Sequence, residues 1–260
     1  MTSPRLALAR AWPDRRPAHV ARERVRLADG RRTSVHVARY EAAATQVRVA
    51  LLYGRPLAAW CAATGVGEAI VGGFFTRPAG EPLGELRTRG IQRRSVPFDA
   101  PWGDVRACVH VQGADLRLAP RDELPAQPAG DLLQAGPLLV RDGVAAFDRA
   151  EDREGFRAGS RQFDSDITAA RHPRAALAIG DGVLLAVACD GRSRFEAGLT
   201  LEELATVLVG LGAHSAINLD GGGSTTLIAG GRMCNRPMAD VGVPEPGGRP
   251  VATALVFEPV

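Results

Sequence analysis

The chain has 260 residues, enough for one domain whose core needs no disulfide or metal to hold it together. Hydrophobic residues make up 45% of the sequence, which excludes an intrinsically disordered protein. The formal net charge is only +3 and all 32 basic residues are arginine, interspersed with acidic ones, so no nucleic-acid-binding surface is expected.

Residues 1–34 are interpreted as a partly ordered N-terminal arm, and residues 35–260 as one domain. The first residues carry Arg5 and Arg10 and lack the apolar stretch of a signal peptide. No apolar run approaches the length of a membrane span, so no membrane partner is expected. The four cysteines form no Cys-x-x-Cys pair, which argues against a zinc site. These features favour a cytoplasmic protein with reduced cysteines.

Taken in chain order, alternating or β-branched runs predict strands at residues 35–40, 46–52, 69–71, 105–112, 116–118, 174–179, 183–189, 215–219, 225–229, 232–234 and 251–257. A short helix is predicted over residues 57–64, where apolar side chains share one face. A second helix is predicted from Leu201 to Leu211, because Thr200 and Glu203 form a capping box and Gly212 is a natural stop.

This pattern predicts an α+β (mixed α/β) fold: a mixed sheet flanked by helices, in a single domain with one βαβ crossover. The crossover joins strands 183–189 and 215–219 through the second helix, and such connections join parallel strands. Each strand ends in an aspartate, Asp190 and Asp220. Both carboxylates should therefore lie at the same edge of the sheet and border one cleft, even with one strand between them.

Three glycines follow Asp220 and are followed in turn by Ser224 and Thr225. Gly221 to Gly223 permit positive φ angles, and their successive amides could form an anion-binding concavity. The run is not a P-loop, since it lacks the Gly-Lys-Ser/Thr ending and leads into a hairpin. The alternative interpretation is a simple tight connection between strands.

The segment from residue 216 to 226, Ala-Ile-Asn-Leu-Asp-Gly-Gly-Gly-Ser-Thr-Thr, closely resembles the signature of the phosphodiester glycosidase family. Further matches follow the family's order, and the resemblance covers residues 47–257. They lie at residues 70–75, 136–140, 172–174, 190–192, 198–204, 235–237 and 249–252. One departure is Val71, which stands where the family usually has asparagine.

The resemblance implies a hydrolase that cleaves the glycosidic bond of a sugar-1-phosphodiester and releases free sugar and a phosphomonoester. Asp220 is then the first candidate for the essential carboxylate. Asp190 is the second, unless it only orients Arg192 or caps the turn, and His172 is a candidate proton shuttle. Phe74, with Phe75 beside it, is a candidate for the sugar pocket. The candidate substrate-binding residues are Gly72, Gly73, Phe74, Arg174, Arg192, Asn218, Gly221, Gly222, Gly223, Ser224, Thr225 and Arg236.

Two other functions stay open at this point. Val71 motivates a non-catalytic module that binds sugar phosphates. A phosphodiesterase that cuts the P–O bond is the other, although no His/Asp cluster with two-metal spacing is visible. The sequence indicates no required cofactor, leaves open a structural divalent cation near the glycine loop, and does not determine the sugar, the aglycone or the oligomeric state.

Overall fold

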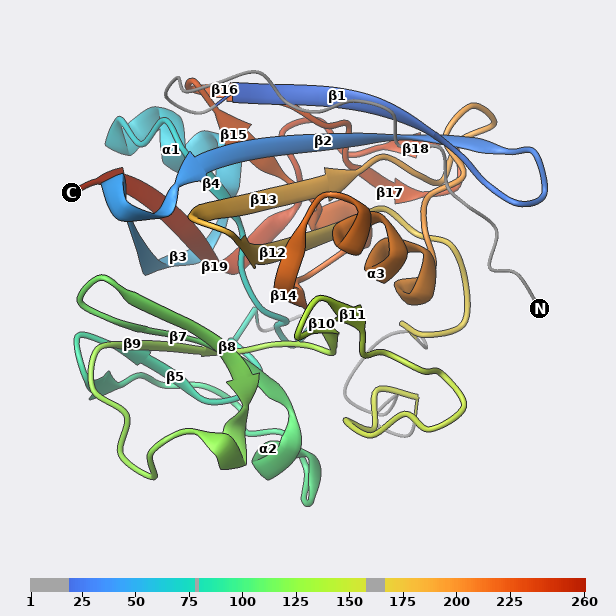
Figure 1. The fold of residues 1–260 in the computed structure, drawn as a ribbon. Coiled ribbons are helices and arrows are strands. Elements are labelled where there is room, and N and C mark those ends of the chain that lie inside the picture. Colours follow the sequence, from blue (N-terminus) through green and yellow to red (C-terminus); the bar gives the residue numbers. More distant parts are fainter. Residues whose placement is uncertain (1–18, 78–79, 158–166) are drawn as a thin grey trace.

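The computed structural model describes residues 19–77, 80–157 and 167–260, and its largest element is a seven-stranded sheet (Figure 1). In spatial order the strands are β1 (His19–Arg26), β2 (Arg32–Glu41), β13 (Val183–Cys189), β12 (Arg174–Gly180), β14 (Ala213–Asn218), β10 (Leu138–Arg141) and β11 (Val144–Ala145). Every neighbouring pair is antiparallel. Because β13 and β14 are both antiparallel to β12 between them, they point the same way, and their ends meet the start of β12 at one edge.

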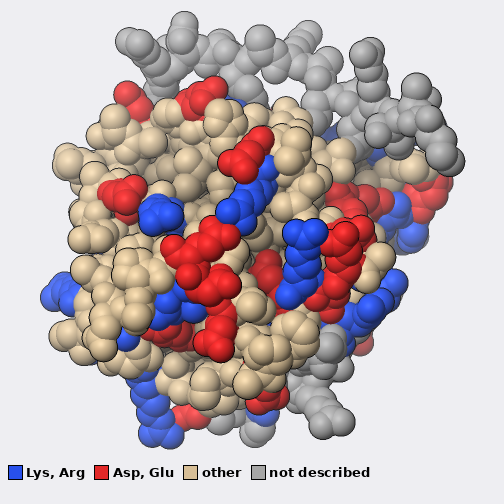
Figure 2. Space-filling view, turned by 60° about the horizontal axis from the view of Figure 1, so that its bottom comes forward, with Lys and Arg blue, Asp and Glu red and all other residues tan. Residues whose placement is uncertain are grey.

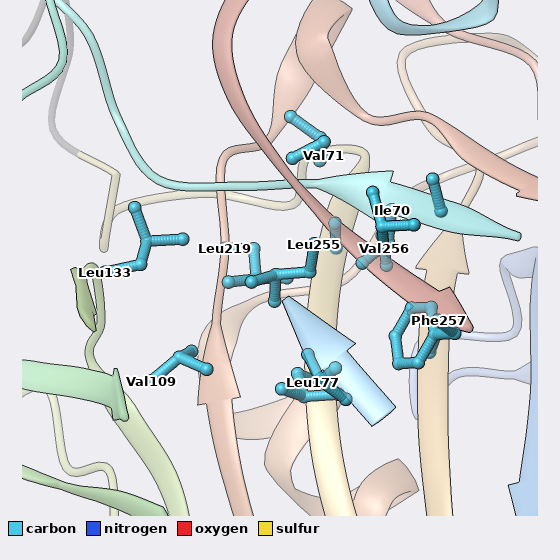
Figure 3. Packing of buried hydrophobic residues seen from close by; sticks show 14 of the residues in the cluster. Ile70, Val71, Val109, Leu133, Leu177, Leu219, Leu255, Val256 and Phe257 are labelled. Carbon is cyan, nitrogen blue, oxygen red and sulfur yellow. The ribbon is translucent and has the colours of Figure 1, made fainter. Parts of the chain in front are cut away.

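A five-stranded sheet packs against one face of the large sheet. Its order is β16 (Arg232–Met233), β15 (Leu227–Ala229), β4 (Ala69–Val71), β19 (Pro250–Pro259) and β3 (Thr45–Pro56). The side-chain alternation of β12 fits this arrangement. Leu177 points into the core between the sheets, near Leu255 of β19 (Figure 3), whereas Ala176 and Ala178 point to the opposite face.

That opposite face is covered by helix α3 (Leu201–Gly210), whose buried side chains include Leu204 and Leu208. The predicted capping box is present. The hydroxyl of Thr200 accepts the backbone N–H of Glu203 at 3.1 Å, and the Glu203 carboxylate accepts the N–H of Thr200 at 3.0 Å. Such a cap contributes about 1 kcal/mol to helix stability. Helix α1 (Leu57–Thr64) lies beside β3 and ends at Gly65, which takes a left-handed conformation.

A third sheet lies below the other two in Figure 1. Its order is β6 (Ile91–Gln92), β5 (Leu86–Thr88), β9 (Asp131–Gln134), β7 (Ala107–Gln112) and β8 (Asp115–Pro120). One face of it joins the main core through Val109 and Leu133 (Figure 3). The other short elements among the described residues are η1 (Ala42–Ala44), α2 (Trp102–Val105), η2 (Arg121–Glu123), η4 (Gly222–Ser224) and the hairpin of β17 (Met238–Asp240) and β18 (Val243–Pro244).

The predicted α+β fold is wrong, because the described residues form mostly strands in antiparallel sheets, with only short helices. The connection from β13 through α3 to β14 exists, and its two strands are parallel. They are not hydrogen-bonded to each other, however, since β12 lies between them. β12 and β13 are joined by a two-residue turn at Asp181 and Gly182, which forces them to pair as an antiparallel hairpin. In a βαβ unit with adjacent strands, β13 would be hydrogen-bonded to β14. Here β13 is hydrogen-bonded to its hairpin partner β12 instead.

The N-terminal arm predicted over residues 1–34 lies outside the described residues up to residue 18, and from His19 onward it contributes β1 and the start of β2 to the large sheet. All four cysteines are free thiols, and Cys61, Cys108 and Cys189 are buried. Within the described ranges no helix is long and apolar enough to cross a membrane.

Charged side chains of both signs are interspersed on the face shown in Figure 2. Several of the described surface arginines form ion pairs with acidic side chains. Arg141 donates from both Nη atoms to the two carboxylate oxygens of Glu123 at 2.9 Å. Many of the arginines in the sequence are thus paired with nearby acidic residues. An ion pair that is exposed to solvent contributes little to the free energy of unfolding.

Candidate functional site

A pocket of about 250 Å³ opens at the sheet edge where β13 and β14 end and β12 begins. It is bordered by the segment after β4, the glycine loop after β14 and the β17–β18 hairpin. The lining residues are Phe74, Phe75, Arg77, Ile167, His172, Arg174, Arg192, Asn218, Leu219, Asp220, Gly221, Gly222, Ser224, Ala239, Asp240 and Arg249.

Asp220 lies in this pocket because the residue before it is anchored in the core. Leu219 is fully buried between the sheets (Figure 3), and the backbone N–H of Asp220 donates to Gly72 O at 3.0 Å. Desolvation raises the pKa of the Asp220 carboxyl to about 6, although Ser224, the N–H of Gly221, Arg249 and Arg77 act in the opposite direction. At neutral pH the group is therefore a carboxylate with unusually high basicity.

The amides of the glycine loop mostly donate within the protein. The N–H of Gly221 donates to Asp220 Oδ1 at 2.8 Å, and that of Gly222 to Pro173 O at 2.9 Å. The N–H groups of Ser224 and Thr225 close the 3₁₀ turn by donating to Gly221 O and Gly222 O. These amides are not available for the anion-binding concavity that the sequence suggests.

Three buried side-chain oxygens around the loop have no hydrogen-bond partner in the described part of the chain: Asn218 Oδ1, Ser224 Oγ and Thr225 Oγ1. The Ser224 hydroxyl is near enough to Asp220 to lower the pKa of that carboxyl. Asn218 is held in place by its amide Nδ2, which donates to Gly136 O at 2.9 Å. Asn218 and Ser224 line the pocket, so a ligand could satisfy their oxygens.

Arg192 reaches the pocket from the turn after β13, where its own φ is +57°. Its Nη1 donates to Ala239 O at 2.7 Å and to Met238 O at 3.3 Å, while its carbonyl accepts the N–H of Gly242 at 2.7 Å. Nη2 lies 3.4 Å from Nδ1 of His172. Burial, together with the nearby Arg249, lowers the pKa of Arg192. The side chain thus fastens the β17–β18 hairpin to the pocket wall.

Arg174 is buried, and its guanidinium donates to carbonyls of two neighbouring segments. Nε donates to Leu199 O at 3.1 Å, and Nη2 donates to Ile167 O at 2.8 Å and Ala170 O at 3.0 Å. The residue lines the pocket as predicted, and it also organises the pocket wall on the side of Ile167.

Asp190 and Arg236 do not line the pocket. Asp190 is buried behind it, where Oδ2 lies 2.9 Å from His36 Nε2 and Oδ1 accepts the backbone N–H of Arg236 at 2.7 Å. Arg236 itself is exposed. The two aspartates end parallel strands at one edge, as expected, but the carboxylate of Asp190 is directed into the protein.

Gly72, Gly73, Gly223 and Thr225 also lie outside the lining and contribute to close packing. A Cβ atom on Gly72 would lie 2.4 Å from Oγ1 of Thr253, so only glycine fits there. The neighbouring Gly73 N–H donates to the same hydroxyl at 3.0 Å. These contacts bring the start of this segment close against β19, ahead of Phe74, which does line the pocket.

Val71 is fully buried in the core (Figure 3) and does not line the pocket. It belongs to the same buried cluster as Ile70 and Leu255, and it pairs with Ala254 of β19. The position where the family usually carries a polar side chain is therefore occupied by a buried apolar one that does not reach the pocket.

Sequence reasoning missed several lining residues, among them Arg77, Ala239, Asp240 and Arg249. They come from segments with no secondary-structure pattern to place them. Arg249 could have been predicted, because it is the first residue of the segment 249–252 that matches the family. No group of three His, Cys, Asp or Glu residues within the described ranges could hold a metal ion. The pocket lining consists of arginines, the carboxylates of Asp220 and Asp240, the imidazole of His172, hydroxyl and amide groups, aromatic rings and a few aliphatic side chains.

Comparison with known proteins gives a consistent result. The family model described as phosphodiester glycosidase matches residues 64–258. A bovine protein named N-acetylglucosamine-1-phosphodiester alpha-N-acetylglucosaminidase is 31% identical over 175 residues, which cover 64% of this chain and 32% of that protein. The chain thus aligns with about a third of the length of this curated relative.

Solved structures show the same fold. The catalytic domain of zebrafish N-acetylglucosamine-1-phosphodiester alpha-N-acetylglucosaminidase, auto-inhibited by its pro-peptide, superimposes with a TM-score of 0.67 at 18% identity, covering 93% of this chain and 82% of that one. A hypothetical protein from Synechocystis gives a TM-score of 0.61 at 19% identity, covering 92% of this chain and 61% of that one.

Proposed function

The chain belongs to the phosphodiester glycosidase family, which confirms the resemblance of its motifs, and we propose that it hydrolyses the glycosidic bond of a sugar-1-phosphodiester. The observation that carries this proposal is the position of Asp220, a carboxylate of raised pKa in a pocket that arginines also line. The glycosidase class agrees with the name of the bovine relative, and that name supports N-acetylglucosamine as the sugar.

The pocket suits the charges of this reaction. The leaving group is a phosphomonoester, whose negative charge is already stabilised, so the reaction depends less on a strong general acid than ordinary glycoside hydrolysis does. Arginine guanidinium groups bind phosphate oxygens and would stabilise the charge that grows as the bond breaks. Arg77 and Arg249 line the pocket with Asp220, and so does Arg192, whose Nη1 already donates to the carbonyls of Met238 and Ala239.

In this proposal the ionised Asp220 lies next to the anomeric carbon. It acts there as base, nucleophile or stabiliser of oxocarbenium character. Asn218 Oδ1, which has no partner among the described residues, and the Ser224 hydroxyl beside Asp220 would accept hydrogen bonds from sugar hydroxyl or amide groups. Phe74 and Phe75 would contact the apolar face of the ring.

The test uses the purified full chain with an N-acetylglucosamine-1-phosphate methyl diester. We expect free N-acetylglucosamine and methyl phosphate, with ¹⁸O from labelled water appearing in the sugar. Asp220→Asn should lose turnover by at least about 100-fold while its circular dichroism spectrum stays native. Label found in the phosphate would reveal P–O cleavage instead, and tight binding without any product would reveal a binding module.

A further inference from the structure

Two adjacent glycines of the loop each face the guanidinium group of one arginine. A Cβ atom on Gly222 would lie 2.9 Å from Nη1 of Arg192, and one on Gly223 would lie 2.5 Å from Nη2 and 2.8 Å from Nε of Arg249. All three distances are shorter than the contacts that a Cβ atom makes in proteins. Each arginine can hold its present position only because the loop residue beneath it has no side chain.

The two guanidinium groups have different surroundings. Arg192 donates from Nη1 to the carbonyls of Met238 and Ala239, so it holds the hairpin. Arg249 is fixed at its backbone, whose N–H donates to Gly223 O at 3.1 Å. Its half-buried guanidinium lines the pocket, and none of the described carboxylates or carbonyls binds it. Arg249 therefore brings unused hydrogen-bond donors to the pocket.

The backbone around Arg249 leaves an anion few other partners. The amides of Gly221, Gly222, Ser224 and Thr225 already donate within the protein. Among the described amides of this loop only that of Gly223 is not used in this way, so a phosphate oxygen entering beside the loop would find most of its hydrogen-bond donors on arginine side chains. The planar fork of a guanidinium group suits two oxygens of one phosphate.

We propose that Gly223 is a positioning residue for Arg249, and that Arg249 is the residue that binds the phosphate oxygens of the substrate, whereas Gly222 lets Arg192 hold the β17–β18 hairpin. This inference rests on the proposed function for its substrate. It assigns separate tasks to two neighbouring glycines. One supports a ligand-binding arginine, and the other supports a structural one.

Gly223→Ala is the informative change. The φ of Gly223 lies outside the positive range, so alanine fits its backbone, and the group that must move is the far end of a flexible arginine. We expect kcat/KM for the methyl diester to fall about 10- to 100-fold, as when a charge-assisted hydrogen bond is lost. Arg249→Gln should give a similar loss. The double variant should be no worse than either single one, because both remove the same interaction.

Matched controls separate the two glycine–arginine pairs. Gly67→Ala makes the same chemical change where the new Cβ would have only an ordinary contact at 3.5 Å, and it should leave kcat/KM unchanged. Combining Gly223→Ala with Arg192→Gln should multiply the two separate losses, since these residues belong to different pairs. Losses of Gly223→Ala and Arg249→Gln that multiply would overturn the proposal.

Binding of inorganic phosphate, measured by calorimetry on the full chain, tests the assignment without turnover. Arg249→Gln and Arg249→Lys leave the loop intact, and both should weaken phosphate binding about 10-fold or more. If phosphate binding falls but no variant or wild-type chain releases sugar, the proposed function fails and the assignment stands. If sugar is released while Arg249→Gln binds phosphate as well as the wild type, the assignment is wrong and the function stands.

Discussion

Nε2 of His36 lies 2.9 Å from Oδ2 of Asp190, and both side chains are buried behind the pocket. The other carboxylate oxygen of Asp190 accepts the backbone N–H of Arg236 at 2.7 Å. Asp190 thus joins β2, the end of β13 and the segment before β17. It lies two residues before Arg192, so the pair supports the turn from which that arginine enters the pocket.

Asp190→Asn should therefore act on stability more than on chemistry. An amide can keep only part of the two acceptor contacts, and a buried pair that loses one partner leaves the other unsatisfied. We expect the free energy of unfolding in urea to fall by about 1–3 kcal/mol. Turnover should fall only modestly, through a less ordered Arg192. Abolished turnover at unchanged stability would instead give Asp190 the chemical role that its sequence position suggests.

The activity should show an acidic limb governed by Asp220. The pKa of this carboxyl is raised to about 6, and the proposed mechanism uses its ionised form. kcat/KM of the free enzyme should therefore fall tenfold per pH unit below about pH 6 and level off above it. A rate profile from about pH 4 to about pH 8 checks this. A profile that rises toward acid would mean that Asp220 acts as the proton donor.

The same pKa predicts that Asp220 lowers stability at neutral pH. Between its ordinary value of 3.8 and the folded value of about 6, the folded chain retains a proton that the unfolded chain has lost. The free energy of unfolding contributed by this group therefore decreases as the pH rises through that window, by up to about 3 kcal/mol.

Asp220→Asn removes this titration and keeps an oxygen that can accept the Gly221 N–H. Its melting temperature should equal or exceed that of the wild type above about pH 6, and the advantage should disappear near about pH 4. A variant less stable than the wild type at every pH would show that the carboxylate is a net structural support.

Arg106 stabilises the segment beside Phe74 from inside the protein. Its guanidinium lies 4.2 Å from the ring centroid of Phe98 and 4.3 Å from that of Phe156. Nε and Nη2 donate to the carbonyls of Glu154 and Gly155, each at 3.0 Å. Phe156 in turn contacts the ring of Phe74, with centroids 5.7 Å apart, and Phe74 lines the pocket.

Arg106→Lys should lower the free energy of unfolding by about 2–4 kcal/mol, because an ammonium group cannot lie flat between two rings and donate to both carbonyls. KM should rise as Phe74 loses support. The control is Arg141→Lys, which alters an exposed ion pair with Glu123 and should cost less than about 1 kcal/mol. Equal effects of the two substitutions in urea unfolding would contradict the structural role of Arg106.

Local patterns in the sequence located most of the elements near the site. Strand β13 spans the predicted residues, and α3 begins at the predicted capping box. Both elements can be predicted from the sequence because they depend on residues only a few positions apart. These are the alternating side chains of β13 and the reciprocal hydrogen bonds between Thr200 and Glu203. The fold class could not, because strand order depends on which edges pair. The pairing of β12 with β13 follows from the short turn between them, whereas the pairing of β12 with β14 on its other side is a choice among distant partners.

The sequence by itself determined the family and the position of Asp220, because both are written in one contiguous motif whose backbone course is local. Only the tertiary structure decided which polar groups remain available. His36 comes from a strand far away in the sequence and forms a hydrogen bond with the carboxylate of Asp190. A backbone carbonyl of the β17–β18 hairpin accepts a hydrogen bond from the guanidinium of Arg192. Arg249 returns from near the C-terminus to the glycine loop with its guanidinium group facing the pocket. Hydrogen-bond donors and acceptors are consumed by whichever partners the fold brings close, and a linear pattern does not contain those distances.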